Sequence, residues 1–266
     1  MKKILYIMIA TILSAMSLVS CDKGLVDEVE QLGKVSFKGF GVTVLNDEEV
    51  IEGRSSSVDV STFKVNVQNK ITGVKVNSWT YSEMPEIVEL PVGSYTVEVY
   101  NAEVKNAAWE SPYFYGVKDF EVKKNDNAIV ENVVCKLANL KVSIKYSNEL
   151  KNAIGTGEDV KVNVLVDENS SLDFAYNETR AGYFRCDNEN KSLVATFSGS
   201  VDGFYITEYK VISDVAAGQH RIITFSLQTP PDVTDETGLV GTSGFSVSGD
   251  VTTIDLTENI PVDEEL

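Results

Sequence analysis

Histidine and cysteine are scarce in this chain: 266 residues include one histidine, His220, and three cysteines. A single histidine excludes every metal site that needs two, including a two-histidine zinc site. A Ser-His-Asp triad would have to use His220, and no Gly-x-Ser-x-Gly motif accompanies it. We therefore interpret His220 as a surface residue outside any catalytic centre.

Basic residues are also few, since 23 Lys and Arg stand against 40 Asp and Glu, for a net charge of −17. A partner with a phosphate backbone requires a basic surface, so nucleic acid is excluded as a partner. Glycine-rich phosphate loops are missing, because Gly39-Phe40-Gly41 lacks the third glycine of the dinucleotide motif. No catalytic residue, cofactor or metal site is predicted, and we expect a protein that is not an enzyme.

Two chemical alternatives remain weak. The 40 acidic residues permit many carboxylate pairs, so a hydrolase with two converging carboxylates is the third choice of function. The oxygen-rich segment 167–173 lacks the glycine and the final glutamate of a calcium-binding EF-hand. We interpret this segment as a turn.

The N-terminus has the pattern of an export signal. Two lysines precede an apolar run of 16 residues, from Ile4 to Val19, which is shorter than the roughly 20 residues of a membrane-spanning helix. The run ends in Leu-Val-Ser-Cys at 18–21, which resembles a bacterial lipobox. We predict a signal peptide over 1–20, cleavage between Ser20 and Cys21, and acylation of Cys21, with palmitate among its chains.

The predicted anchor is lipid alone. Several acyl chains on one cysteine hold a protein stably on a membrane, whereas one chain does so only marginally. Residues 21–33 are short and acidic and are predicted to be a lipidated tether. We expect an outer-membrane protein on the surface or on the periplasmic face, and the sequence leaves the leaflet open.

Alternation of apolar and polar residues dominates the rest of the chain. It runs through 63–68, 95–99, 140–146 and 160–166, with Gly, Asn and Asp clusters between the runs. Period-two alternation predicts half-buried strands. We predict an all-β fold with two tandem antiparallel β-sandwiches of transthyretin or immunoglobulin type, over 34–136 and 137–266. A helix is expected only near 147–154, and the first strand over 34–44.

The two cysteines beyond Cys21 are Cys135 and Cys186. An exported protein lies in an oxidising compartment, where a disulfide can form. Cys135 ends an apolar stretch, which favours a small buried apolar side chain. The sequence leaves the pairing of the two cysteines open.

An aromatic run is the most informative surface feature. It comprises Trp109, Tyr113, Phe114 and Tyr115, and a proline and a glycine at 112 and 116 predict a loop that presents the rings. Exposed aromatic faces stack on sugars or anchor protein partners. Trp109, Tyr113 and Tyr115 are therefore candidate ligand contacts, and packing over the open end of the first sandwich is the alternative.

Five ordered sequence blocks carry a family resemblance. They are Asp59–Phe63, Ser78–Pro85, Leu90–Tyr95, Trp109–Gly116 and Cys135–Val142. The stretch 59–146 resembles an exported lipoprotein family of Gram-negative gut bacteria that is known as a domain of unknown function. More distantly, the two-sandwich plan is similar to fimbrillin-like proteins, the surface pilus subunits and anchors.

The fimbrillin resemblance implies a partner and a processing site. Such subunits are trimmed at an arginine after the first strand, and a neighbour's strand then fills the groove by β-strand addition. Arg54 lies in a polar loop after the predicted first strand and is the candidate site; an ordinary exposed arginine is the alternative. The resemblance implies a non-enzymatic surface lipoprotein of fimbrillin-like or adhesin type. The alternative is a glycan-binding lipoprotein that serves polysaccharide uptake.

Overall fold

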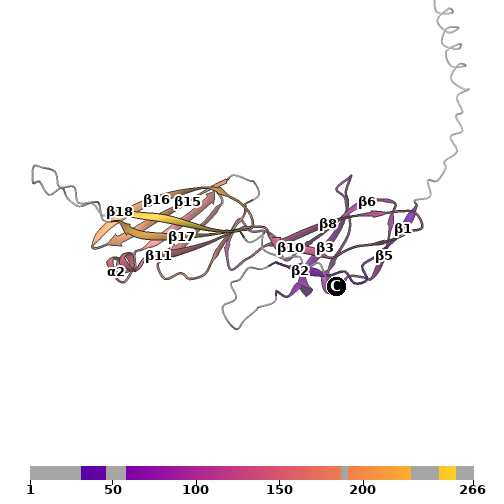
Figure 1. Cartoon of the computed structure of the whole chain (residues 1–266), viewed down its shortest axis with the longest axis horizontal. Coiled ribbons are helices and arrows are strands. Elements are labelled where there is room, and N and C mark those ends of the chain that lie inside the picture. Colours follow the sequence, from indigo (N-terminus) through magenta and orange to yellow (C-terminus); the bar gives the residue numbers. More distant parts are fainter. Residues whose placement is uncertain (1–30, 46–57, 187–190, 229–245, 256–266) are drawn as a thin grey trace, which may run out of the picture.

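The computed structural model describes residues 31–45, 58–186, 191–228 and 246–255. The signal peptide, Cys21 and the loop with Arg54 lie outside these ranges. The described chain forms two β-sandwiches that lie end to end along the long axis, as Figure 1 shows. The predicted all-β sandwich fold is thereby confirmed. Within the described ranges, no helix has the length and apolar character that a membrane crossing requires.

The first sandwich consists of nine strands and two short 3-10 helices among the described residues. They are β1 (Leu32–Ser36), β2 (Val42–Val44), η1 (Val60–Thr62), β3 (Lys64–Asn69), β4 (Lys75–Thr80), η2 (Tyr81–Glu83), β5 (Ile87–Pro91), β6 (Gly93–Tyr100), β8 (Phe114–Val122), β9 (Asn127–Ile129) and β10 (Val133–Leu137). One sheet has the order β2-β10-β8-β6-β3-β4, and the other has the order β5-β1-β9. The alternating residues Val65, Val97 and Val99 point into the core between them and are fully buried.

The first strand is not continuous over 34–44, so that prediction is wrong. The chain turns at Gly39, whose φ of 81° suits glycine, and Phe37 and Phe40 on either side are buried. β1 pairs with β5 and β9, whereas β2 pairs with β10 in the facing sheet. The two aromatic rings drive this crossing, because both enter the core between the sheets.

The second sandwich contains the remaining described elements. They are β7 (Ala107–Trp109), β11 (Leu140–Tyr146), α2 (Asn148–Ile154), β12 (Lys161–Asp167), β13 (Ser170–Ala175), β14 (Gly182–Phe184), β15 (Lys191–Val201), β16 (Phe204–Val215), β17 (Gln219–Gln228) and β18 (Ser246–Asp255). Its sheets have the orders β18-β17-β11-β14-β7 and β13-β12-β15-β16. The predicted helix near 147–154 is α2, and the Ser147 side chain caps it by accepting a hydrogen bond from the Leu150 N–H at 3.2 Å.

Three strand pairs are parallel, so the sheets are mixed and not purely antiparallel as predicted. The pairs are β1 with β9, β2 with β10, and β11 with β17. Parallel neighbours need a long connection between them. In each pair the strands are far apart in sequence, and strands of both sheets lie between them along the chain.

The buried apolar residues form two clusters with little sequence overlap. The first runs from Val35 to Leu137 and the second from Leu140 to Phe225. β7 is one exception, because Ala107 and Trp109 pack against the second cluster although they precede β8 of the first. Tyr183 of β14 is another, because it packs against the first cluster. The domain bounds of 34–136 and 137–266 stay a prediction.

The two cysteines lie in different clusters and are not joined to each other. Cys135 is fully buried in the first cluster, and its thiol donates to the Val99 carbonyl at 3.6 Å. Burial raises the pKa of this thiol to about 12, which keeps it protonated. Cys186 lies in the second cluster, where its thiol donates to the Val215 carbonyl at 3.6 Å. Cys135 is thus a small apolar core residue.

Candidate functional site

The outer face of the six-stranded sheet carries a set of neighbouring polar and aromatic side chains. Val65 on β3 and Val97 on β6 point into the core. Side chains alternate along a strand, so their neighbours on each strand, such as Asn66 and Glu98, point outward. Register places Asn66 of β3 opposite Glu98 of β6, and Tyr100 of β6 opposite Tyr115 of β8. We call this set the tyrosine face; its members are Asn66, Gln68, Ser78, Glu98, Tyr100, Tyr113 and Tyr115.

Hydrogen bonds join six members of the tyrosine face in two groups of three, and the Tyr113 ring stacks on Tyr115. The Glu98 carboxylate oxygen Oε1 accepts from Gln68 Nε2 at 2.8 Å and from the Tyr115 hydroxyl at 3.1 Å. Asn66 donates to the Tyr100 hydroxyl at 3.1 Å and accepts from the Ser78 hydroxyl at 2.7 Å. These bonds satisfy Asn66, which is only 2% exposed.

Tyr113 and Tyr115 are stacked at one end of the tyrosine face. Their ring centroids are 6.2 Å apart and their planes differ by 27°. Partial burial, followed by the charge of Glu98 and the hydrogen bond to it, raises the pKa of Tyr115, and burial raises that of Tyr113. Both hydroxyls therefore stay protonated at neutral pH. The pair offers apolar ring surface and hydroxyl groups within one half-buried patch.

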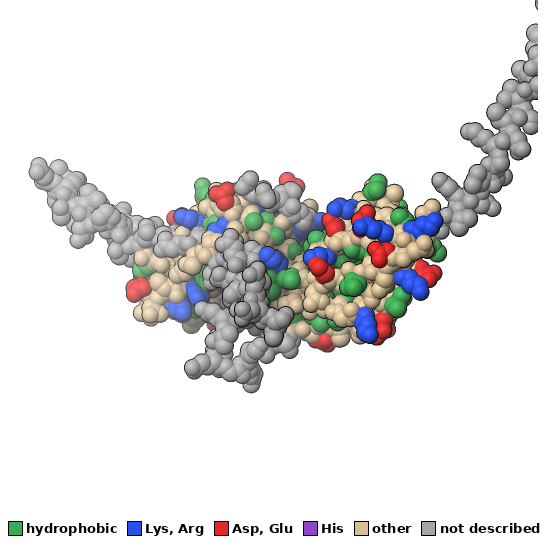
Figure 2. All heavy atoms as spheres, turned by 45° about the vertical axis from the view of Figure 1, so that its right-hand side comes forward, with side chains coloured by type: hydrophobic (Ala, Val, Ile, Leu, Met, Phe, Trp, Pro, Cys, Tyr) green, Lys and Arg blue, Asp and Glu red, His purple; other side chains and the backbone are tan. Residues whose placement is uncertain are grey.

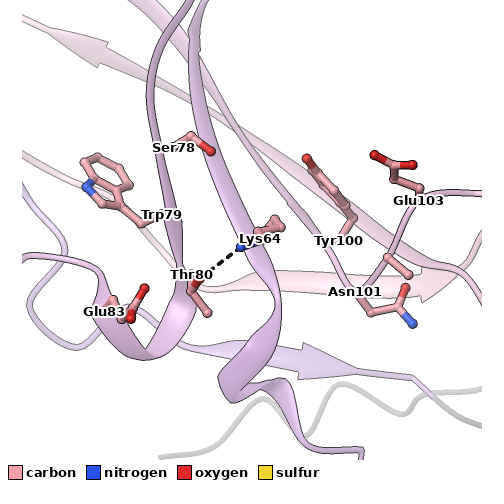
Figure 3. A pocket seen from close by; sticks show the side chains of 9 residues that line it. Lys64, Ser78, Trp79, Thr80, Glu83, Tyr100, Asn101 and Glu103 are labelled. Carbon is pink, nitrogen blue, oxygen red and sulfur yellow. Dashed lines mark hydrogen bonds between the residues drawn. The ribbon is translucent and has the colours of Figure 1, made fainter.

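A hollow of about 520 Å³ adjoins the tyrosine face at the edge strand β4. Its lining is mainly polar and consists of Lys64, Ser78, Trp79, Thr80, Glu83, Tyr100, Asn101, Ala102 and Glu103. Figure 3 shows Trp79 pointing away from Tyr100, while Lys64 reaches Thr80 by a hydrogen bond of 3.1 Å. The hollow offers hydroxyl, amide, ammonium and carboxylate groups to a polar ligand.

The aromatic run does not form the predicted loop. Tyr113 lies in the segment between β7 and β8, and the other members belong to these two strands, which lie in different sandwiches. Tyr115 lies in β8, and Trp109 lies in β7, which pairs with β14. The Trp109 ring meets Phe174 edge-on at a centroid distance of 4.6 Å, and the guanidinium of Arg180 lies 5.0 Å from the ring centroid. Trp109 therefore packs on the second sandwich, not over the end of the first.

His220 is half-buried, so the interpretation as a surface residue is corrected. Its Nε2 lies 2.9 Å from the Ser143 hydroxyl on the neighbouring strand β11. Burial, with the positive charges of Lys141 and Lys145, lowers the pKa of His220 to about 4. The ring is neutral at physiological pH and lies within a sheet ladder.

Ser20, Cys21 and Arg54 are outside the described residues, so their predicted roles stay predictions. Within the described ranges, no group of three or more His, Cys, Asp and Glu side chains could hold a metal ion. In the acidic segment 167–173, Asp167 pairs with Lys191 at 3.2 Å and Asp173 with Lys161 at 3.1 Å. These carboxylates are therefore engaged with lysines.

Sequence reasoning missed Asn66, Glu98, Tyr100 and the hollow. The alternation around Val97 and Val99 indicates that Glu98 points away from the core, which is the signal that was available. It does not indicate which residues on β3 and β8 lie beside Glu98. That information resides in the register of the three strands.

Comparison with solved structures gives similar proteins of low sequence identity. A candidate cell adhesion protein of Bacteroides eggerthii is 10% identical, with a TM-score of 0.43 over 85% of this chain and 96% of that one. A fimbrial assembly protein of Parabacteroides distasonis is 11% identical, with a TM-score of 0.42 over 84% and 98%. A candidate polysaccharide-binding protein of Bacteroides thetaiotaomicron is 11% identical, with a TM-score of 0.42 over 73% and 92%.

No curated protein matches the chain significantly. The family model described as a domain of unknown function, DUF4493, matches residues 39–264. This match extends well beyond the stretch 59–146 on which the resemblance was based. It covers most of the chain, including every described strand except β1. The chain therefore belongs to the DUF4493 family.

Proposed function

We propose that this chain is a non-enzymatic, lipid-anchored cell-surface protein of fimbrillin-like or adhesin type, which anchors or assembles surface structures. The observation that carries the proposal is the order of parts along the molecule. A lipobox-like segment ends at Cys21, β1 begins only eleven residues later at Leu32, and two sandwiches then follow end to end (Figure 1). The chain thus projects an elongated body away from the proposed anchor.

The pairing of β1 supports an anchor over a subunit that loses its first strand. β1 is the central strand of its sheet, with β5 on one side and β9 on the other. Its Val35 is fully buried. Cleavage at Arg54 and loss of the preceding chain would remove this central strand and expose the core beneath it.

Intact-mass and peptide mass spectrometry of protein from native outer membranes tests the proposal. We expect a mature N-terminus at acylated Cys21 and an uncut segment 52–57. C21A should be neither acylated nor retained at the surface, as measured by protease treatment of intact cells. An unmodified Cys21 in the native protein would refute the lipid anchor. A new N-terminus at Ser55 would show that the anchor and the first strand are removed, and would indicate a polymerising subunit.

Glycan binding in the service of polysaccharide uptake is the second candidate function. The stacked pair Tyr113 and Tyr115 beside Glu98 favours it, because tyrosine rings with adjacent hydrogen-bonding groups suit a sugar surface. Y113A and Y115A should each weaken retention of the protein in polysaccharide-containing gels. I71A, at an exposed position on the β3–β4 turn, is the control. Unchanged retention of both tyrosine variants would remove this candidate.

A further inference from the structure

The β15–β16 hairpin carries exposed aromatic side chains that no packing explains. Phe204 is 65% exposed, Tyr205 is 68% exposed and Tyr209 is 72% exposed. Among the described residues, all exposed large aromatic side chains lie on this one strand. Exposing a ring to water is unfavourable, so exposed rings that share one side of a strand indicate a surface with a partner.

Alternation divides these rings between the two faces of β16. Ile212 is buried in the second cluster. Phe204 lies an even number of residues from Ile212, so it is on the same, inward side of the strand. Tyr205, Thr207 and Tyr209 lie an odd number of residues from Ile212, so they are on the opposite, outward side of the strand. The two tyrosines are four residues apart, which places them about 14 Å from each other along the strand. Such a span accommodates a short oligosaccharide.

Hydroxyl groups occupy the neighbouring positions of β15. Register places Ser200 opposite Tyr205, Ser198 opposite Thr207 and Thr196 opposite Tyr209. The outward face therefore presents ring, hydroxyl and ring in succession along the strand. We call this surface of Thr196, Ser198, Ser200, Tyr205, Thr207 and Tyr209 the hairpin face.

The hairpin face has no charged member, although 24% of the chain is Asp, Glu, Lys or Arg. The charged residues Glu208 and Lys210 of β16 lie on the inward side of the strand, with Ile212. The carboxylate of Asp159 reaches one end of the face, where it accepts a hydrogen bond from the Ser200 N–H at 3.0 Å. Figure 2, in contrast, shows acidic and basic side chains interspersed over the visible surface. On the neighbouring strand β12, Lys161 lies opposite Ser198, and its ammonium is paired with the Asp173 carboxylate at 3.1 Å, so these two charges compensate each other. A surface whose own members are uncharged, on a protein of net charge −17, is complementary to an uncharged partner.

We propose that the hairpin face binds a neutral glycan chain, with the rings of Tyr205 and Tyr209 stacked on sugar units and the hydroxyls between them bonded to the sugar. A second copy of the chain fits less well. Protein interfaces have a contiguous apolar core. Here Thr207 separates the two tyrosine rings, although Val211, which is 50% exposed, continues the apolar surface beyond Tyr209. The site also lies far from the proposed anchor: the N–H of Asp202 in the hairpin turn donates to the Ala153 carbonyl of α2, at the end of the molecule opposite β1 (Figure 1). The inference rests on the proposed surface role, which gives this end access to external glycans.

Affinity electrophoresis of detergent-solubilised full-length protein tests the inference. The gels contain a neutral β-glucan, a galactomannan or starch, with polygalacturonate as the acidic control. We expect retardation in at least one neutral gel, and Y205A and Y209A should each weaken it about tenfold. F204A is the matched control, because it removes an equally exposed ring from the other face of the same strand, and it should be retarded like the wild type.

A second variant separates ring stacking from folding. Y209F keeps the ring and should keep the retardation, and thermal unfolding of every variant should match the wild type because the rings are exposed. Migration unaffected by all neutral gels would overturn the inference, as would retardation that persists in the Y205A/Y209A double variant. A wild-type dimer that the double variant loses in sedimentation would overturn it in favour of a second copy. Failure of acylation or surface display would refute the proposed function while leaving the gel result intact.

Discussion

Replacement of Trp109 by alanine should destabilise the second sandwich, although Trp109 precedes strands of the first. Its ring is half-buried against Phe174, and β7 forms the edge of the five-stranded sheet. Truncation removes roughly 100 Å² or more of buried apolar surface, worth about 2.5 kcal/mol. The lost edge-on ring contact contributes about 0.5 kcal/mol more. We expect W109A to lower the free energy of unfolding of the second sandwich by about 3 kcal/mol.

Urea unfolding combined with hydrogen exchange measures this effect. At a urea dependence of about 1.5 kcal/mol per molar, a loss of 3 kcal/mol lowers the midpoint by about 2 M. Exchange should accelerate in peptides of β12 and β15, whereas those of β3 and β6 should stay protected. W109F keeps an aromatic ring against Phe174 and should lose less than half as much stability.

The opposite regional pattern would refute the reasoning. Faster exchange in β3 and β6, with β12 and β15 unaffected, would place Trp109 in the core of the first sandwich. An unchanged midpoint would mean that the ring contributes no packing at all. The chain has two tryptophans, and Trp79 packs against the first cluster. The residual fluorescence of W109A therefore reports on the first sandwich alone and should keep its wild-type transition.

Three further substitutions test other parts of the fold. S147A removes the hydroxyl that accepts a hydrogen bond from the Leu150 N–H, and it should lower the free energy of unfolding by about 1 kcal/mol. Urea unfolding measures this loss, with K151A, which leaves the cap in place, as the control. His220 has a folded pKa of about 4 against 6.5 for the free side chain. The unfolded chain therefore takes up a proton that the folded chain does not, so stability should fall as the pH drops from 6.5 to 4; H220Q should flatten this dependence, and an unchanged slope would contradict the burial of the ring. G116A places a Cβ 2.5 Å from the Val134 carbonyl oxygen and should cost about 1–3 kcal/mol, and a thermal midpoint equal to the wild type would show that β8 and β10 are less tightly packed.

Local pattern was sufficient for the type of the elements. The runs 63–68, 95–99, 140–146 and 160–166 are strands β3, β6, β11 and β12, because a half-buried strand imposes a period of two on the sequence. The helix at 148–154 was also predictable from local sequence, because a capping serine precedes it. The family was also within reach, because its sequence blocks occur in order.

Pairing decided what local pattern could not. Alternation shows that Glu98 faces away from the core, but only the register of β3, β6 and β8 brings it to Gln68 and Tyr115. The same holds for Trp109. Its proximity to Tyr115 in the sequence suggested one aromatic patch, but β7 pairs with β14, which places Trp109 in the other sandwich. The parallel pairs had no local signal, because their partners are far apart along the chain.

The sequence by itself determined that the chain is built of strands, that its N-terminus has the pattern of an export signal followed by a lipobox-like cysteine, and that it contains few basic residues and no pair of histidines. These properties depend on composition and on short-range periodicity, which are readable residue by residue. Only the tertiary structure decided which outward side chains become neighbours, in the tyrosine face and in the hairpin face. The physical reason is that a strand presents its outward residues singly, and a surface able to hold a ligand arises only when hydrogen-bonded register aligns several strands.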